Sequence, residues 1–278
     1  DPLSKLNKQP VQKSVAPHIF PAGHTCEMNL PIQTSDGGTG SVGIAPEADW
    51  RYYVINFAGN DHRCGQLGRA LLLLEPSIEL GNCFFKDEDF GMRGRATPTN
   101  QISTFFSSAA MMSFTQISED SIAPTAELFA KISHLQKGVV SAALERHAQI
   151  LALPRHSDMV VLAAFTILES LITHSPRSPW HGDSLNHQVS TKMALLNGRF
   201  TKPLDHPRID CSDQKSLWKK LYDLRSAIAH GDIPDFSSKS LRDLHSRESA
   251  WELLSQALKR LLVLSLSEFE LITALKDC

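Results

Sequence analysis

Apolar residues recur with two different spacings along the chain, and the change falls near residue 121. Before it, they gather in short runs that are rich in aromatic or branched side chains and bounded by Gly, Pro or Asn, which is typical of strands. These predicted strands cover residues 50–59, 69–76 and 83–85. After it, apolar residues recur every three or four positions, which predicts helices.

Capping residues divide the second part into separate helices. Ser157 and Ser212 are predicted N-caps, because a serine hydroxyl can accept a hydrogen bond from the first turn. Asp183 or Ser184 is a third, and Gly231 is a predicted helix end. We expect one or two helices over 125–151 and single helices over 159–173, 184–198, 213–230 and 247–276.

Glycine and proline follow the same division of the chain. Residues 1–120 hold 11 of the 15 glycines and 8 of the 15 prolines. Both residues favour turns and loops over helix interiors. We therefore expect an α+β fold with two domains: a strand-rich domain of sensory or regulatory role over residues 1–120, and a helical bundle over 121–278.

Charge and cysteine content narrow the class of protein. The formal net charge of -2 excludes a globally basic nucleic-acid coat but leaves room for a local basic groove. The five cysteines are scattered and contain no CxxC, so a reducing cytoplasm is expected. The longest apolar stretch, residues 261–272, is too short to span a bilayer, so no membrane association is expected. The chain begins with Asp1 rather than Met, which suggests that it is part of something longer.

Two histidine–cysteine pairs are the candidates for a metal site. His24 with Cys26 and His62 with Cys64 are each separated by one residue. No companion ligands follow at the spacings that structural zinc prefers. We therefore expect neither a metal nor a cofactor.

The stretch LYDLRSAIAHGD, residues 221–232, holds the residues most suited to chemistry. Arg225 and His230 are five residues apart, so on a straight helix they lie about 140° out of register. Because His230 precedes the predicted end at Gly231, its side chain can leave the helical path and converge with Arg225 on one ligand. Arginine offers a planar fork of donors that fits a phosphate, and a helix C-terminus stabilises imidazolium. The pair suggests phosphodiester chemistry without a metal.

This stretch resembles the Rx4-6H signature of HEPN domains, and most closely that of the ApeA-like branch. Upstream, FTILESLIT resembles the early helix of that branch and NHQVSTKMALLNG its intervening helix. The resemblance covers residues 121–278 and does not reach residues 1–120. It implies an α-helical bundle that forms a homodimer, in which two Arg/His motifs line a shared cleft.

In many members this fold is a metal-independent endoribonuclease, and we expect this chain to be one that acts as an effector in anti-phage or toxin-type defence. The resemblance places Arg225 and His230 at the two motif positions and Ser226 where many active members carry Asn, Asp or His. It assigns Glu169 to the acid of the early helix, which would hold Arg225 or the helix pair. The implied reaction is attack by an RNA 2′-hydroxyl on the adjacent phosphate.

Several neighbouring residues remain open between a site role and a structural one. Tyr222 lies one turn before Arg225 and either lines the cleft or packs in the core. Asp232 is the last residue of an HGD sequence that also occurs at 181–183. The loop that carries His181 could approach the cleft and add this histidine to it, although chance also explains the repeat. The alternative function is an inactive HEPN dimer module that binds RNA, a nucleotide or a protein partner. Ser226 keeps that alternative open.

Overall fold

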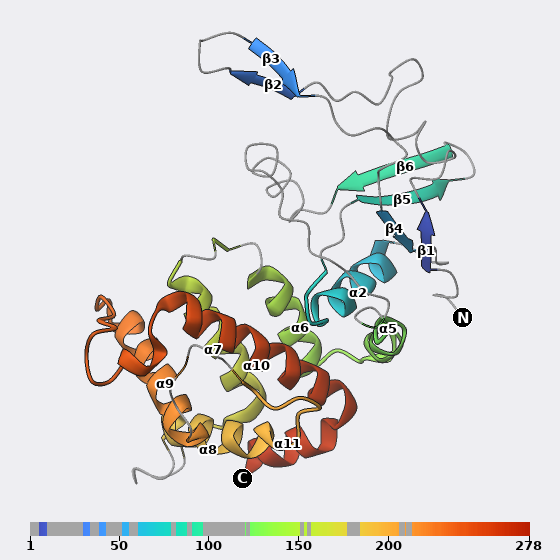
Figure 1. Cartoon of the computed structure of the whole chain (residues 1–278). Coiled ribbons are helices and arrows are strands. Elements are labelled where there is room, and N and C mark those ends of the chain that lie inside the picture. The colour runs from blue at the N-terminus through green and yellow to red at the C-terminus, as the bar shows by residue number, and fades with distance from the viewer. Residues whose placement is uncertain are drawn as a thin grey trace. The chain divides into compact units, whose positions relative to one another are not determined.

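The computed structural model describes helices over most of the second half of the chain and separate segments of the first half (Figure 1). The described residues are 6–9, 30–33, 39–42, 52–55, 61–78, 82–87, 91–96, 120, 123–150, 153–154, 157–176, 184–205, 209 and 213–278. Contacts group the chain into two units. The first comprises Asp1–Gly65 and Glu79–Gln116, and the second comprises Gln66–Ile78 and Ile117–Cys278.

Six short strands belong to the first unit. They form three separate antiparallel pairs: β1 (Leu6–Gln9) with β4 (Tyr52–Ile55), β2 (Leu30–Gln33) with β3 (Thr39–Val42), and β5 (Asn82–Asp87) with β6 (Gly91–Ala96). Strands therefore occur in two of the three predicted segments, 50–59 and 83–85. An isolated two-stranded pair is marginally stable in water, because independent stability requires further strands or packing against a helix.

The prediction of an α+β fold with a strand-rich N-terminal domain is wrong. Within the described residues no strand pair joins another into a larger sheet. Side chains are described for residues 62–78, 120 and, with gaps, 123–278, and all of these residues lie in helices or in the connections between them.

The third predicted strand, residues 69–76, shows why the prediction failed. Helix α2 (Asp61–Leu72) runs through the start of this segment. The run of four leucines there is typical of a buried strand, but in α2 the buried apolar residues are Leu67, Ala70 and Leu71. Their offsets of three and one place them on one face of the helix. The segment is helical up to Leu72 because this face packs into the helical unit.

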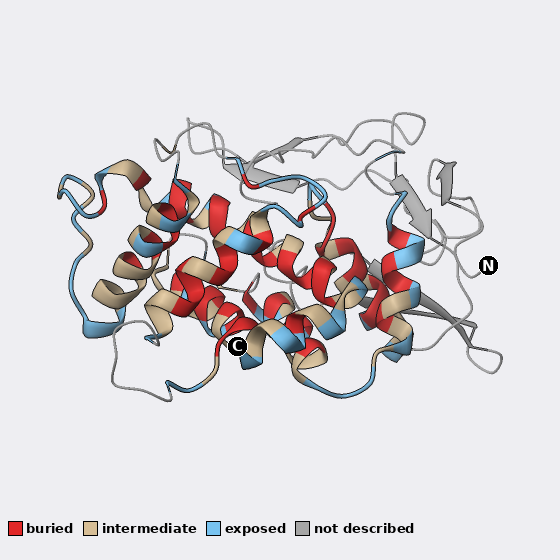
Figure 2. Cartoon of the chain, turned by 90° about the horizontal axis from the view of Figure 1, so that it is seen from below, coloured by how far each residue is buried: buried red, intermediate tan, exposed pale blue. Residues whose placement is uncertain are grey.

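The helical unit contains most of the described helices. They are the second half of α2, followed by α5 (Thr125–His134), α6 (Val139–Ile150), α7 (Met159–Ile172), α8 (Leu185–Asn197), α9 (Gln214–His230), α10 (Arg247–Ser267), α11 (Phe269–Asp277) and the short 3-10 helix η3 (Arg242–Leu244). Helix α7 packs against α6, α8, α9, α10 and α11. Its nearly all-apolar sequence fits this central position, and the buried residues, red in Figure 2, run through the helices of this unit.

Most of the predicted helix ends are close to the observed ones. Ser184 is the N-cap of α8, and its hydroxyl accepts a hydrogen bond from the amide of His187. At α7 the N-cap is Asp158, one residue after the predicted Ser157. The predicted last helix, 247–276, is wrong as a single element, because Glu268 leaves the helical conformation and separates α10 from α11.

Residues 66–78 are held in the helical unit by hydrogen bonds from side chains of α10. The guanidinium of Arg260 donates two 2.7 Å hydrogen bonds to the carboxylate of Glu75 and two 2.8 Å hydrogen bonds to the carbonyls of Lys202 and Pro203. The ammonium group of Lys259 donates to the carbonyl of Leu74. A segment from the glycine-rich first part of the chain therefore belongs to the helical unit.

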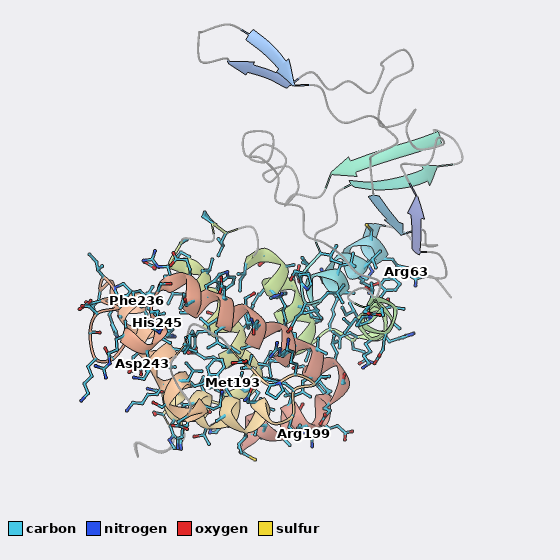
Figure 3. The ribbon with its side chains drawn as sticks, in the orientation of Figure 1. Arg63, Met193, Arg199, Phe236, Asp243 and His245 are labelled. Carbon is cyan, nitrogen blue, oxygen red and sulfur yellow. The ribbon has the colours of Figure 1, made fainter. Side chains whose placement is uncertain are left out.

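A strained turn connects η3 to α10. Figure 3 labels Phe236, Asp243 and His245 in the segment between α9 and α10. His245 has φ 59° and ψ -50°, and the amide of Ser246 donates to the carbonyl of Leu244 at 2.7 Å. This is a γ-turn with positive φ at its central residue, a backbone conformation that residues other than glycine rarely adopt.

Candidate functional site

Helix α9 carries the predicted Arg/His motif and has a defined cap at each end. The carboxylate of Asp213 accepts hydrogen bonds from the amides of Lys215 and Ser216. At the other end Gly231 has φ 82°, and the amide of Asp232 donates to the carbonyl of Ala227 at 2.9 Å. The prediction that the helix ends at Gly231 is confirmed, and this glycine adopts the left-handed conformation. The N-cap is Asp213, one residue after the predicted Ser212.

One face of α9 is buried, and its position determines where Arg225 lies on the helix. Its buried residues are Leu217, Trp218, Leu221 and Leu224. Helix α9 packs against α8 and α7. The residue after Leu224 is Arg225, which therefore lies at the edge of the buried face rather than on its exposed side.

Arg225 lies against Glu169 of α7. The Nη2 atom of Arg225 is 3.4 Å from Oε1 and 3.5 Å from Oε2 of Glu169. The arginine side chain is 29% exposed and that of the glutamate 18%, so the pair lies between the core and the surface. Arg225 Nε is buried and has no hydrogen-bond partner among the described residues. The carboxylate therefore contacts the arginine at Nη2, through distances that are long for a hydrogen bond.

Tyr222 lies beside this ion pair. The Cζ atom of Arg225 is 5.5 Å from the centroid of the Tyr222 ring, within the range of a cation–π contact. The same ring meets Phe165 of α7 edge to face, with centroids 5.7 Å apart and planes at 89°. The contacts from Phe165 to Tyr222 and from Glu169 to Arg225 advance together along both helices, so α7 and α9 run in the same direction.

Partial burial changes the acid–base behaviour of two of these groups. Burial raises the pKa of the Glu169 carboxyl, and the charge of Arg225 opposes this rise. Burial also raises the pKa of the Tyr222 hydroxyl, and the Glu169 charge adds to the rise. Tyr222 therefore remains neutral at physiological pH, so its ring presents an uncharged face to Arg225.

The remaining motif residues lie nearer the solvent. His230 is exposed and is the last residue of α9. It lies about 7.5 Å further along the helix axis than Arg225. No hydrogen bond or ion pair joins the two within the described part of the chain. Ser226 is half-buried and Asp232 is exposed, whereas His181 lies outside the described residues.

Phe165 was missed by the sequence reasoning although it supports the cluster. It is fully buried and lies four residues before Glu169, on the same face of α7. On α9, Tyr222 likewise lies about one turn before a charged residue, Arg225. An aromatic residue one turn before a polar residue on each of two neighbouring helices is the signal that could have identified it.

Metal ligands do not gather in the part of the chain that the structure describes. Among those residues, no group of three or more His, Cys, Asp and Glu side chains could hold a metal ion. His62 and Cys64 are both on α2. His24 and Cys26 lie outside the described residues. The same part of the chain contains no helix long and apolar enough to cross a membrane.

No protein-family model, curated protein or solved structure matches this chain. The fold and the site together define a helical unit in which the half-buried Glu169–Arg225 pair lies beside the ring of Tyr222. Five residues after Arg225, an exposed histidine ends helix α9.

Proposed function

We propose that the chain is a metal-independent endoribonuclease that acts through Arg225 and His230. The single observation that carries the proposal is the arrangement of α9. Its arginine is contacted by Glu169 at Nη2 and remains partly exposed, and its histidine is exposed at a helix end that turns at Gly231. A fixed cation for a phosphate and an accessible imidazole are the two groups that RNA cleavage by its own 2′-hydroxyl requires.

In the proposed reaction the bond between the 2′-oxygen and phosphorus forms while the bond between phosphorus and the 5′-oxygen breaks. The imidazole of His230 accepts the proton of the 2′-hydroxyl. A protonated imidazole of the second motif in a shared dimer cleft supplies the proton to the departing 5′-oxygen. Arg225 stabilises the additional charge on the phosphorane. The products are a 2′,3′-cyclic phosphate and a 5′-hydroxyl.

The local geometry suits these roles. The positive φ of Gly231 turns the chain away immediately after His230, which leaves the imidazole accessible. Arg225 and His230 of one helix lie about 140° out of register, so they do not share a face of that helix. In a homodimer joined near these residues, two such motifs would line one cleft.

A second function is favoured by one observation. Glu169 already contacts Arg225, and Ser226 occupies the position after the arginine. An arginine that is already neutralised can retain a phosphate pocket without supporting turnover. The second candidate is therefore a dimeric module that binds RNA, a nucleotide or a protein partner without cleaving RNA.

The experiment compares RNA cleavage by the full chain and by three variants. His230→Ala should lower the rate by about 10²- to 10⁴-fold, the scale of a positioned acid or base. Arg225→Lys should also lose most activity, because an ammonium group lacks the planar fork. His134→Ala, which removes an exposed histidine on α5, is the matched control and should cleave normally. Binding of RNA without cleavage by the unaltered chain would instead support the second candidate.

A further inference from the structure

The guanidinium of Arg225 is contacted by two different kinds of group. At its Nη2 edge lies the Glu169 carboxylate, and over Cζ lies the Tyr222 ring, 5.5 Å from centroid to carbon. An arginine side chain has several rotatable bonds, and a single long ion pair leaves its plane free to rotate. A second contact, made by a ring against the flat face of the guanidinium, restricts this rotation.

We propose that Tyr222 is a positioning residue that fixes the plane of the Arg225 guanidinium. Glu169 holds one edge and the ring supports one face, so the remaining donors present one orientation to a phosphate oxygen. The substrate role of that orientation rests on the proposed function, whereas the positioning itself does not.

The surroundings of Tyr222 suit this role. Its ring is held edge to face by Phe165, which is fully buried in the central helix α7. The chain therefore contains a continuous support from the core through Phe165 and Tyr222 to Arg225. Each member is held by the one nearer the core, and the last one reaches the partly exposed layer.

The buried Nε of Arg225 gives the proposal a direct readout. It has no hydrogen-bond partner in the described part of the chain, so its proton reports the local environment of the guanidinium alone. The NMR signal of this N–H can be recorded in the full chain with labelled arginine and assigned with Arg225→Lys. We expect a distinct, slowly exchanging signal in the unaltered protein.

Three variants separate positioning from packing. Tyr222→Phe keeps the ring face and should keep both the signal and the RNA cleavage rate within about twofold. Tyr222→Leu keeps an apolar side chain but removes the ring, so the signal should broaden. The turnover rate should then fall by about three- to thirtyfold, with a smaller change in KM. Phe129→Leu is the matched control: it removes a buried ring on α5 that is not part of this support, so it should lower stability while the signal persists.

Two results would overturn the proposal. One is an Arg225 signal that is the same in Tyr222→Leu as in the unaltered protein. The other is an equal change in Tyr222→Leu and Phe129→Leu, which would mean that Tyr222 only fills space. An absence of RNA cleavage by the unaltered chain would contradict the proposed function instead, and the NMR signal would still decide the role of Tyr222.

Discussion

Replacing His147 should remove a large part of the acid sensitivity of this protein. His147 lies on α6 and is 3% exposed. Burial, together with the charge of Lys259 on α10, lowers the pKa of the imidazole to about 4. Because Lys259 donates to the carbonyl of Leu74, this cation is held at the point where residues 66–78 join the bundle.

The size of the effect follows from proton linkage. Between pH 6.5 and pH 4 the unfolded chain binds a proton at His147 that the folded chain does not bind. The free energy of unfolding therefore falls as the pH falls through this range. The difference between the ordinary pKa of 6.5 and about 4 corresponds to about 3 kcal/mol in total. About 2 kcal/mol of this is lost by pH 5.

Urea unfolding of the unaltered protein and of His147→Gln at several pH values between 7 and 4.5 measures this difference. Glutamine does not titrate, so the variant should lose about 2 kcal/mol less than the unaltered protein between pH 7 and pH 5. Only the change with pH is compared, so a constant loss of stability in the variant cancels. His134→Gln, at an exposed site on α5, is the matched control. Parallel pH profiles for the unaltered protein and His147→Gln would refute the reasoning.

Two further predictions concern stability. Arg260→Lys should lower the free energy of unfolding by about 2 kcal/mol, because lysine cannot replace the paired hydrogen bonds to Glu75 and the loop carbonyls. Arg199→Lys, at an ion pair that is more exposed, should change it by less than half as much in the same urea titration, and equal losses would contradict the role of Arg260. His245→Gly should raise the midpoint of thermal unfolding by relieving a positive φ worth about 1 kcal/mol, and a lower midpoint would mean that the turn is not strained.

The helices around the candidate site could be predicted because local signals agree with tertiary packing there. In α9 the apolar stripe marks the buried face and Gly231 marks the end, and both act within a few residues. The apolar stripe and Gly231 also show where Arg225 and His230 lie on this helix, so the pair could be chosen as candidates from the sequence. The contact of Arg225 with Tyr222 was also within reach, since residues three apart on a helix are neighbours.

The features that could not be predicted depend on contacts between distant parts of the chain. Residues 66–78 join the helical unit through Arg260, which is 185 residues away from Glu75 in the sequence. The break at Glu268 has no glycine or proline to mark it. It coincides with an ion pair from Glu268 to Arg199 and is followed by α11, where the ammonium group of Lys276 donates to the carbonyl of Ser170 at the end of α7.

The chemical nature of the RNA ends produced by the purified chain in EDTA tests the central claim most directly. We predict 2′,3′-cyclic phosphate and 5′-hydroxyl ends by mass spectrometry, and their loss in the double variant Arg225→Ala/His230→Ala. A single 2′-deoxy nucleotide at the cut position should abolish cleavage there, because the nucleophile is the hydroxyl of the RNA itself. Cleavage that stops in EDTA, or that continues unchanged in the double variant, would contradict the account.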